Sequence, residues 1–72
     1  MTRELVVSSS IVSVGYCRAR NVLEVEFVRG GIYEYLNVPA KEHGALMSTA
    51  SKGQYINGVI KGRYVFRRMG TR

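Results

Sequence analysis

The first half of the chain alternates hydrophobic and polar residues with a period of two. This period is typical of strands that have one face in a hydrophobic core and the other in water. Residues 10–17, 22–28 and 32–36 follow it, and the short loops 18–21 and 29–31 separate them. The glycines of the second loop permit the positive φ of a tight turn. The pattern therefore predicts three antiparallel strands joined as a β-meander.

Hydrophobic and acidic side chains are expected on opposite faces of this sheet. Glu24, Glu26 and Glu34 occupy polar positions of the alternation. A face that carries three glutamates is a poor surface for a phosphate backbone, so a polyanion would bind elsewhere on the domain. The expected hydrophobic face consists of Val12, Val14, Tyr16, Leu23, Val25, Phe27, Tyr33 and Tyr35.

The segment after the third strand has the composition of a helix. Pro39 suits a helix entrance, because its φ is already helical and its missing N–H is not needed there. Residues 40–49 then contain several helix formers. We expect this first helix to turn Ala45 and Leu46 toward the sheet.

A second helix is expected to begin at Ser51. Ser51 and Gln54 have the spacing of a capping box, in which the serine oxygen accepts a hydrogen bond from a backbone N–H at the helix start. Gly62 is placed to cap the C-terminus of this helix. Residues 64–66 favour an extended segment, either a fourth strand or a segment packed along the sheet edge. The hydrophobic stripe of the second helix would contain Tyr55, Ile56, Val59 and Ile60.

These elements predict an α+β fold, an antiparallel β-meander of three to four strands with two short helices packed on one face. The chain has 72 residues and no internal repeat or linker, so we expect a single domain over residues 1–72. No hydrophobic run approaches the length of a membrane-spanning helix, and the first residues lack the long apolar segment of a signal peptide. We expect a cytoplasmic protein that does not bind membranes.

Candidate catalytic chemistry is scarce in this chain. Cys17 and His43 are the only cysteine and histidine, and there is no aspartate. Tetrahedral zinc ligation and a Ser-His-Asp arrangement therefore both lack their parts. A nucleophile pair of Cys17 and His43 stays formally open, although a lone cysteine in a hydrophobic strand pattern is usually a packing residue. We expect a protein that is not an enzyme and needs no metal ion or other cofactor.

The formal net charge of +6 is concentrated in the second half of the chain. Residues 1–42 contain five basic and five acidic residues, whereas residues 43–72 contain six basic residues and no acidic one. Such a segment attracts polyanions, although a solvated face that only keeps a small protein soluble has the same composition. If the partner is a nucleic acid, we expect phosphate contacts from Lys52, Lys61, Arg63, Arg67 and Arg68. Asn57 would add a polar contact, and Tyr64 or Tyr55 would offer a ring on which a base can stack.

An ordered set of short motifs spans nearly the whole chain. In chain order the motifs are Ser9-Ser10-Ile11, Val14-Gly15-Tyr16, Leu23-x-Val25-x-Phe27, Gly31-x-Tyr33-x-Tyr35, Val38-Pro39, Leu46, Ala50-Ser51-x-Gly53-x-Tyr55 with Asn57, Ile60-Lys61, Tyr64 and Arg67. This set resembles the KTSC domain, a small module at the C-terminus of some lysyl-tRNA synthetases that also occurs alone in bacteria and phages.

The resemblance implies a non-catalytic module with a role in binding RNA. Our leading hypothesis is a nucleic-acid-binding accessory module that prefers RNA to DNA and binds through its basic C-terminal half. The alternative is a protein–protein interaction or assembly module, including a homo-oligomer formed through an open sheet edge.

Overall fold

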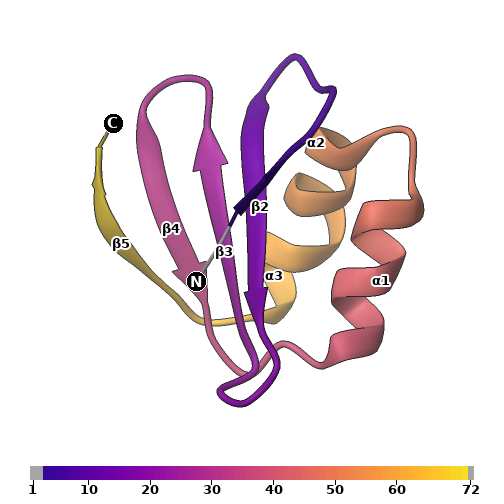
Figure 1. The fold of residues 1–72 in the computed structure, drawn as a ribbon, viewed down its shortest axis with the longest axis vertical. Coiled ribbons are helices and arrows are strands. Elements are labelled where there is room, and N and C mark those ends of the chain that lie inside the picture. Colours follow the sequence, from indigo (N-terminus) through magenta and orange to yellow (C-terminus); the bar gives the residue numbers. More distant parts are fainter. Residues whose placement is uncertain (1–2, 72) are drawn as a thin grey trace.

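The structure is a computed structural model that describes residues 3–71, and its framework is one five-stranded antiparallel sheet (Figure 1). Neighbouring strands in the chain are neighbours in the sheet, so the order is β1-β2-β3-β4-β5. Such a meander needs only short connections between strands β1 to β4. The strands are β1 (Arg3–Leu5), β2 (Ile11–Cys17), β3 (Val22–Phe27), β4 (Gly31–Tyr35) and β5 (Phe66–Thr71).

All helices lie on the same side of the sheet, and in the sequence they come between β4 and β5 (Figure 1). The first is α1 (Ala40–Ser48). The second is one continuous helical segment made of α2 (Lys52–Tyr55), the π-helical turn η1 (Ile56–Ile60) and α3 (Lys61–Arg63). We call this segment the second helix.

The hydrophobic core lies between the sheet and the helices. Leu23 and Val25 of β3 are fully buried, as are Leu46 of α1 and Ile56 and Ile60 of the second helix. Burying a side chain of this kind contributes about 1.5 to 3 kcal/mol each. Packing of one sheet face against both helices therefore accounts for the α+β fold. The remaining members of the core are Ile11, Val14, Tyr35 and Val38.

The α+β class, the antiparallel meander and the two helices are confirmed, but the predicted number of three to four strands is wrong. The sheet has five strands because β1 is added at one edge and β5 at the other. With only three residues, β1 is too short to show an alternation. In β5 a register shift opposite Ile32 and Tyr33 hides the period of two.

A β-bulge also changes the predicted hydrophobic face of β2. The pairing of β2 with β3 shifts between Ile11 and Ser13. Ile11 is consequently buried in the core together with Val14, whereas Val12 is outside the core cluster. Simple alternation had assigned Val12 to that face, because an extra residue in a strand cannot be recognised from the pattern alone.

The ends of the helices differ from prediction in three details. Pro39 does precede α1, and Leu46 is buried, but Ala45 is exposed. The expected capping box is wrong, because Ser51 makes no side-chain cap hydrogen bond and its φ of −112° and ψ of 67° lie outside the usual N-cap conformation. Gly62 lies inside α3, and the extended residue Tyr64 ends the second helix instead.

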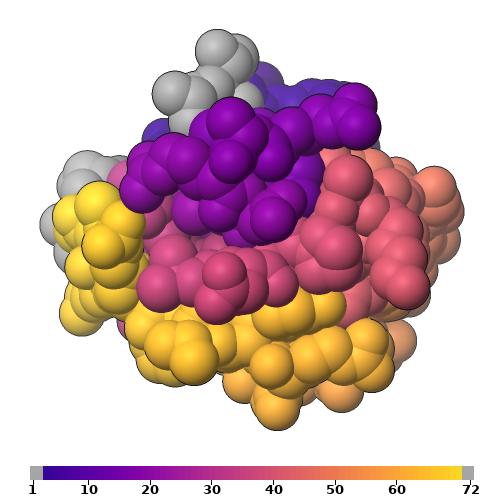
Figure 2. All heavy atoms as spheres, turned by 90° about the horizontal axis from the view of Figure 1, so that it is seen from below, coloured from indigo at the N-terminus to yellow at the C-terminus, as the bar shows by residue number. Residues whose placement is uncertain are grey.

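Backbone hydrogen bonds join three connections at one end of the molecule. The Val38 N–H donates to the Asn21 carbonyl at 2.8 Å, and the Leu36 N–H donates to the Val65 carbonyl at 2.8 Å. Figure 2 shows the β2–β3 turn (purple), the segment after β4 (magenta) and the segment leading into β5 (yellow) side by side at this end. These contacts fix where the chain enters β5. In residues 3–71 no helix is long and apolar enough to cross a membrane.

Candidate functional site

A groove of about 960 Å³ opens on the helix-bearing face of the sheet, beside the second helix. We call it the aromatic groove, because Phe27, Tyr33, Tyr35 and Phe66 line it. The period of two places Tyr33 and Tyr35 on the same face of β4, and the pairing with β5 sets Phe66 opposite Tyr35. The helices bury Tyr35 but leave Phe66 51% exposed. The uncovered end of the hydrophobic face forms the groove.

The rings of the groove contact one another at angles that leave faces open. The centroids of Phe27 and Tyr33 are 5.6 Å apart in an edge-to-face arrangement, and those of Tyr33 and Phe66 are 5.4 Å apart with a tilt of 51°. Such pairs stabilise each other by about 0.5 to 1.5 kcal/mol beyond the area they bury. Burial raises the pKa of Tyr35 to about 12, so this phenol stays neutral at physiological pH. The groove therefore has a rigid, uncharged aromatic floor.

Positive charges surround this floor. The Lys61 ammonium lies 5.5 Å from the centre of the Phe27 ring, and the Arg68 guanidinium lies 6.0 Å from the centre of the Tyr33 ring. Both distances suit weak cation–π contacts. Arg29 is a third basic residue of the lining, and among residues 3–71 no carboxylate lines the groove. Neither Lys61 nor Arg68 forms an ion pair with any residue in the described range 3–71, so both charges are available to a ligand.

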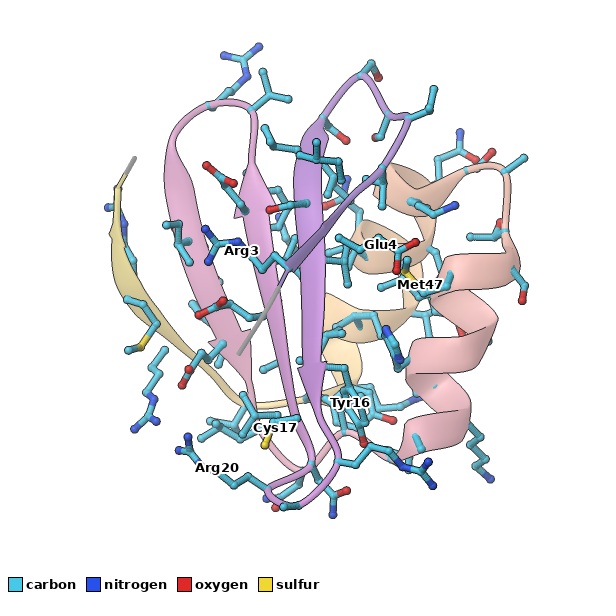
Figure 3. All side chains as sticks on the ribbon, in the orientation of Figure 1. Arg3, Glu4, Tyr16, Cys17, Arg20 and Met47 are labelled. Atoms are coloured by element: carbon cyan, nitrogen blue, oxygen red, sulfur yellow. The ribbon has the colours of Figure 1, made fainter. Side chains whose placement is uncertain are left out.

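Glu24, Glu26 and Glu34 lie on the opposite face of the sheet, where two arginines bind them. Arg3 donates to Glu24 at 2.7 Å and lies 3.7 Å from Glu26, and Figure 3 shows its side chain extending over this outer face. At the other edge Arg67 donates two hydrogen bonds to Glu34 at 2.9 and 3.0 Å. The sheet therefore separates the ion pairs of Arg3 and Arg67 on the outer face from the groove cations Lys61 and Arg68 on the inner face.

Glu42 of α1 is buried and accepts three hydrogen bonds, two from residues of the second helix and one from Tyr64 at its C-terminal end. The Tyr55 hydroxyl donates at 2.5 Å, the Tyr64 hydroxyl at 2.8 Å and an Arg63 N–H at 2.9 Å. These bonds, first of all the one from Tyr55, hold the pKa of Glu42 below its usual value although burial alone would raise it. This network anchors the second helix to α1.

The structure does not bring Cys17 and His43 together. The His43 ring stacks on Tyr16, with centroids 4.7 Å apart and planes within 8° of parallel. Tyr16 points toward α1 in Figure 3, whereas Cys17, the next residue of β2, points to the other face of the sheet. Burial lowers the pKa of His43. The formally open nucleophile pair of the sequence is therefore not assembled.

Comparison with known proteins decides the family. The family model described as the KTSC domain matches residues 7–64 of the chain. The chain belongs to the KTSC domain family. A crystal structure of a KTSC domain protein from Yersinia pestis is 43% identical, covers 96% of this chain and 97% of its own, and superimposes with a TM-score of 0.92.

Two curated relatives illustrate the contexts in which KTSC sequences occur. A protein from Stutzerimonas stutzeri is 41% identical over 61 residues, which are 85% of this chain and 86% of the relative. A lysine–tRNA ligase from Nostoc punctiforme is 36% identical over 61 residues, but these are only 11% of that ligase. KTSC sequences are thus found both as most of a small protein and as a small part of a large one.

The KTSC fold brings some of the sequence-predicted binding residues together and separates others. Asn57, Lys61 and Arg68 line the aromatic groove. Lys52 lies nearby in a polar hollow of about 320 Å³ that shares Asn57 with the groove. The others are engaged elsewhere: Arg63 and Tyr64 bind Glu42, and Arg67 binds Glu34 on the outer face.

Sequence reasoning missed the aromatic lining itself. Phe27 and Tyr33 were assigned to a hydrophobic face, which is correct, but nothing in the pattern indicates that the helices leave part of that face uncovered. Phe66 was placed only in an extended segment of unknown position. One signal was available, because the small second helix offers few large hydrophobic side chains to cover four aromatic rings.

Proposed function

We propose that this KTSC domain is a non-catalytic accessory module that binds nucleic acid, RNA in preference to DNA, in the cytoplasm. The observation that carries the proposal is the aromatic groove, in which Arg29, Lys61 and Arg68 stand around aromatic rings, Phe66 among them exposed, with no carboxylate from the described part of the chain. Unpaired cations attract phosphates, and rings offer stacking surfaces. The similarity to a lysine–tRNA ligase, an enzyme whose name states that it acts on tRNA, favours RNA.

A binding role suits the side chains of the groove better than a catalytic one. The described residues of its lining include neither histidine, cysteine nor a carboxylate, the groups most often used in general acid–base and nucleophilic catalysis. Arginine and lysine can position phosphates without reacting with them. We therefore infer that the groove holds a ligand that another protein, or another domain, processes.

The direct test is a titration of labelled single-stranded and duplex RNA at two salt concentrations. Binding is expected to weaken steeply with salt, because each phosphate contact on a single strand contributes about 0.7 to the slope of log K against log salt concentration. Absence of binding at low salt would contradict the proposal.

Two adjacent arginines provide a matched pair of variants. Arg68 stands over Tyr33 in the groove, whereas Arg67 is bound to Glu34 on the outer face. Arg68→Ala is expected to weaken RNA binding and to lower the salt slope by about 0.7, since one phosphate contact is lost. Arg67→Ala removes the same charge and is expected to leave the slope unchanged. Equal losses from both variants would argue for non-specific attraction.

A second candidate function is assembly with another copy of the chain through β5. β5 is an edge strand, and Val65 and Met69 are 72% and 50% exposed at this edge. Unpaired strand edges with exposed hydrophobic side chains favour strand addition. Light scattering distinguishes this candidate, because it predicts a discrete dimer that forms without RNA. A monomer at all concentrations would exclude it.

A further inference from the structure

The aromatic groove has a second property besides its charge, which is that two of its cations lie over two of its rings. Lys61 lies over Phe27 and Arg68 over Tyr33, while the exposed Phe66 ring is tilted against Tyr33. A flat cationic group on a ring occupies the position that a stacked base would take. Arg68 therefore lies on the side of Tyr33 from which a flat ligand would approach that ring.

We propose that the aromatic groove binds an unpaired base of a single-stranded nucleic acid. The base stacks on the exposed Phe66 ring and lies against Tyr33, so that it displaces Arg68 from Tyr33 toward a neighbouring phosphate. Lys61, which also lines the groove, contacts the phosphate on the other side of that nucleotide. This proposal rests on the proposed function, since it adds a base-binding step to phosphate binding.

The shape of the groove favours an unpaired base over a duplex. Bases in a duplex stack on one another, so their faces are not available to protein rings, whereas single strands, loops and ends can insert a base. The volume of about 960 Å³ lies in the range of pockets that hold small organic molecules. A duplex could contact only the cations at the rim and would leave the rings unused.

The polar residues of the wall suggest where the strand continues. Asn57, Ser9 and Ser10 line both the aromatic groove and the adjoining polar hollow, and Lys52 lies in that hollow. The Asn57 amide is exposed and can both donate and accept a hydrogen bond at a base edge. A strand that leaves the groove across Asn57 therefore reaches Lys52, so that one track joins Arg68, Lys61, Asn57 and Lys52.

The test separates stacking from phosphate binding by removing the bases. A fluorescein-labelled oligouridylate and a strand of the same length without bases, which has the same phosphates, are titrated at low salt. We expect the strand without bases to bind at least about fivefold more weakly, since stacking on an aromatic side chain is worth roughly that factor or more per base. Equal affinities would overturn the base-binding step and leave the phosphate-binding function intact. If neither strand binds, both proposals fail.

A conservative variant shows whether the groove supplies the stacking surface. Phe66→Leu keeps a hydrophobic side chain of similar position but removes the ring. It is expected to weaken binding of the oligouridylate by at least about threefold and to leave the strand without bases unaffected. Met69→Leu, on the same strand and equally exposed but outside the groove, is the control and should change neither affinity. Unchanged oligouridylate binding by Phe66→Leu, with the fold verified by circular dichroism, would place the base elsewhere and overturn the proposal.

Discussion

Glu42 shows how a single residue determines which side chains remain available for a ligand. Its carboxylate accepts hydrogen bonds from Tyr55, Arg63 and Tyr64, all of which the sequence had suggested as nucleic-acid contacts. The donors are 13 to 22 positions away in the chain, so no local pattern reveals the network. The basic residues of the second half are therefore not equivalent: some are bound internally and others face solvent.

The stability of the domain should depend on pH through Glu42. The pKa of Glu42 is lower in the folded chain than its ordinary value of 4.5, so its contribution is complete above that value and is lost as the pH falls below it. Glu42→Gln is expected to lower the free energy of unfolding at pH 7 by about 2 kcal/mol, because buried hydrogen bonds to a charged group are replaced. Urea denaturation from pH 7 to pH 3 measures this.

The difference between the wild type and Glu42→Gln should shrink as the pH falls below about 4.5. Glu4→Gln, which changes an exposed glutamate of β1, is the control and should alter stability by less than about 0.5 kcal/mol. A difference between wild type and Glu42→Gln that is as large at pH 3 as at pH 7 would rule out the proposed role of the Glu42 charge.

At the scale of elements, the two edge strands are fastened to the sheet in the same way. Arg3 of β1 reaches Glu24 and Glu26 of β3, and Arg67 of β5 reaches Glu34 of β4. Both clamps lie on the outer face, so that face serves the stability of the edges. Neither β1 nor the full length of β5 was predicted, because their attachment depends on pairs between distant residues and not on a local period.

Each clamp should stabilise its own edge. Arg3→Ala is expected to cost about 1 kcal/mol, and Arg67→Ala about 0.5 kcal/mol because the Arg67 side chain is 53% exposed and water screens its ion pair. Amide hydrogen exchange measures the effect locally. Arg3→Ala should speed exchange in the β1–β2 ladder, and Arg67→Ala in the β4–β5 ladder. Uniform acceleration across the whole sheet in either variant would show that the arginines act on global stability instead.

The elements that the sequence predicts well are those whose pattern is regular. The alternation in residues 22–28 and 32–36 predicted both the strands and their buried faces. The hydrophobic stripe with Ile56 and Ile60 predicted the buried side of the second helix. The predicted caps at Ser51 and Gly62 were wrong, because the backbone conformation at a helix end depends on its contacts with the rest of the fold. The groove could not be predicted, since it depends on how far the helices extend over the sheet.

At the scale of the whole molecule, basic residues differ in whether a glutamate neutralises their charge. Three arginines, Arg3, Arg63 and Arg67, are paired with glutamates. Lys61 and Arg68 border the groove without such partners among residues 3–71. The sequence located the positive excess in the C-terminal half, and within it the structure separates Arg63 and Arg67, which are paired, from Lys61 and Arg68, which line the groove.

Variants of equal charge test whether location matters. The double variant Lys61→Gln, Arg68→Gln and the double variant Arg18→Gln, Arg20→Gln each lower the net charge by two, but Arg18 and Arg20 lie in the exposed β2–β3 turn. The first is expected to lower the salt slope of RNA binding by about 1.4 and the second to leave it nearly unchanged. Equal slopes for the two variants would indicate binding by total charge without a defined site.

Cys17 lies on the face of the sheet that points away from the groove, and it is the sole thiol of the chain. A single maleimide dye would therefore attach to every molecule at the same place without entering the groove. The same linkage to a sensor surface would present all copies in one orientation, with the groove toward the solution. The strand alternation that separates Cys17 from Tyr16 thus gives the wild-type chain a ready attachment point for measuring its own ligands.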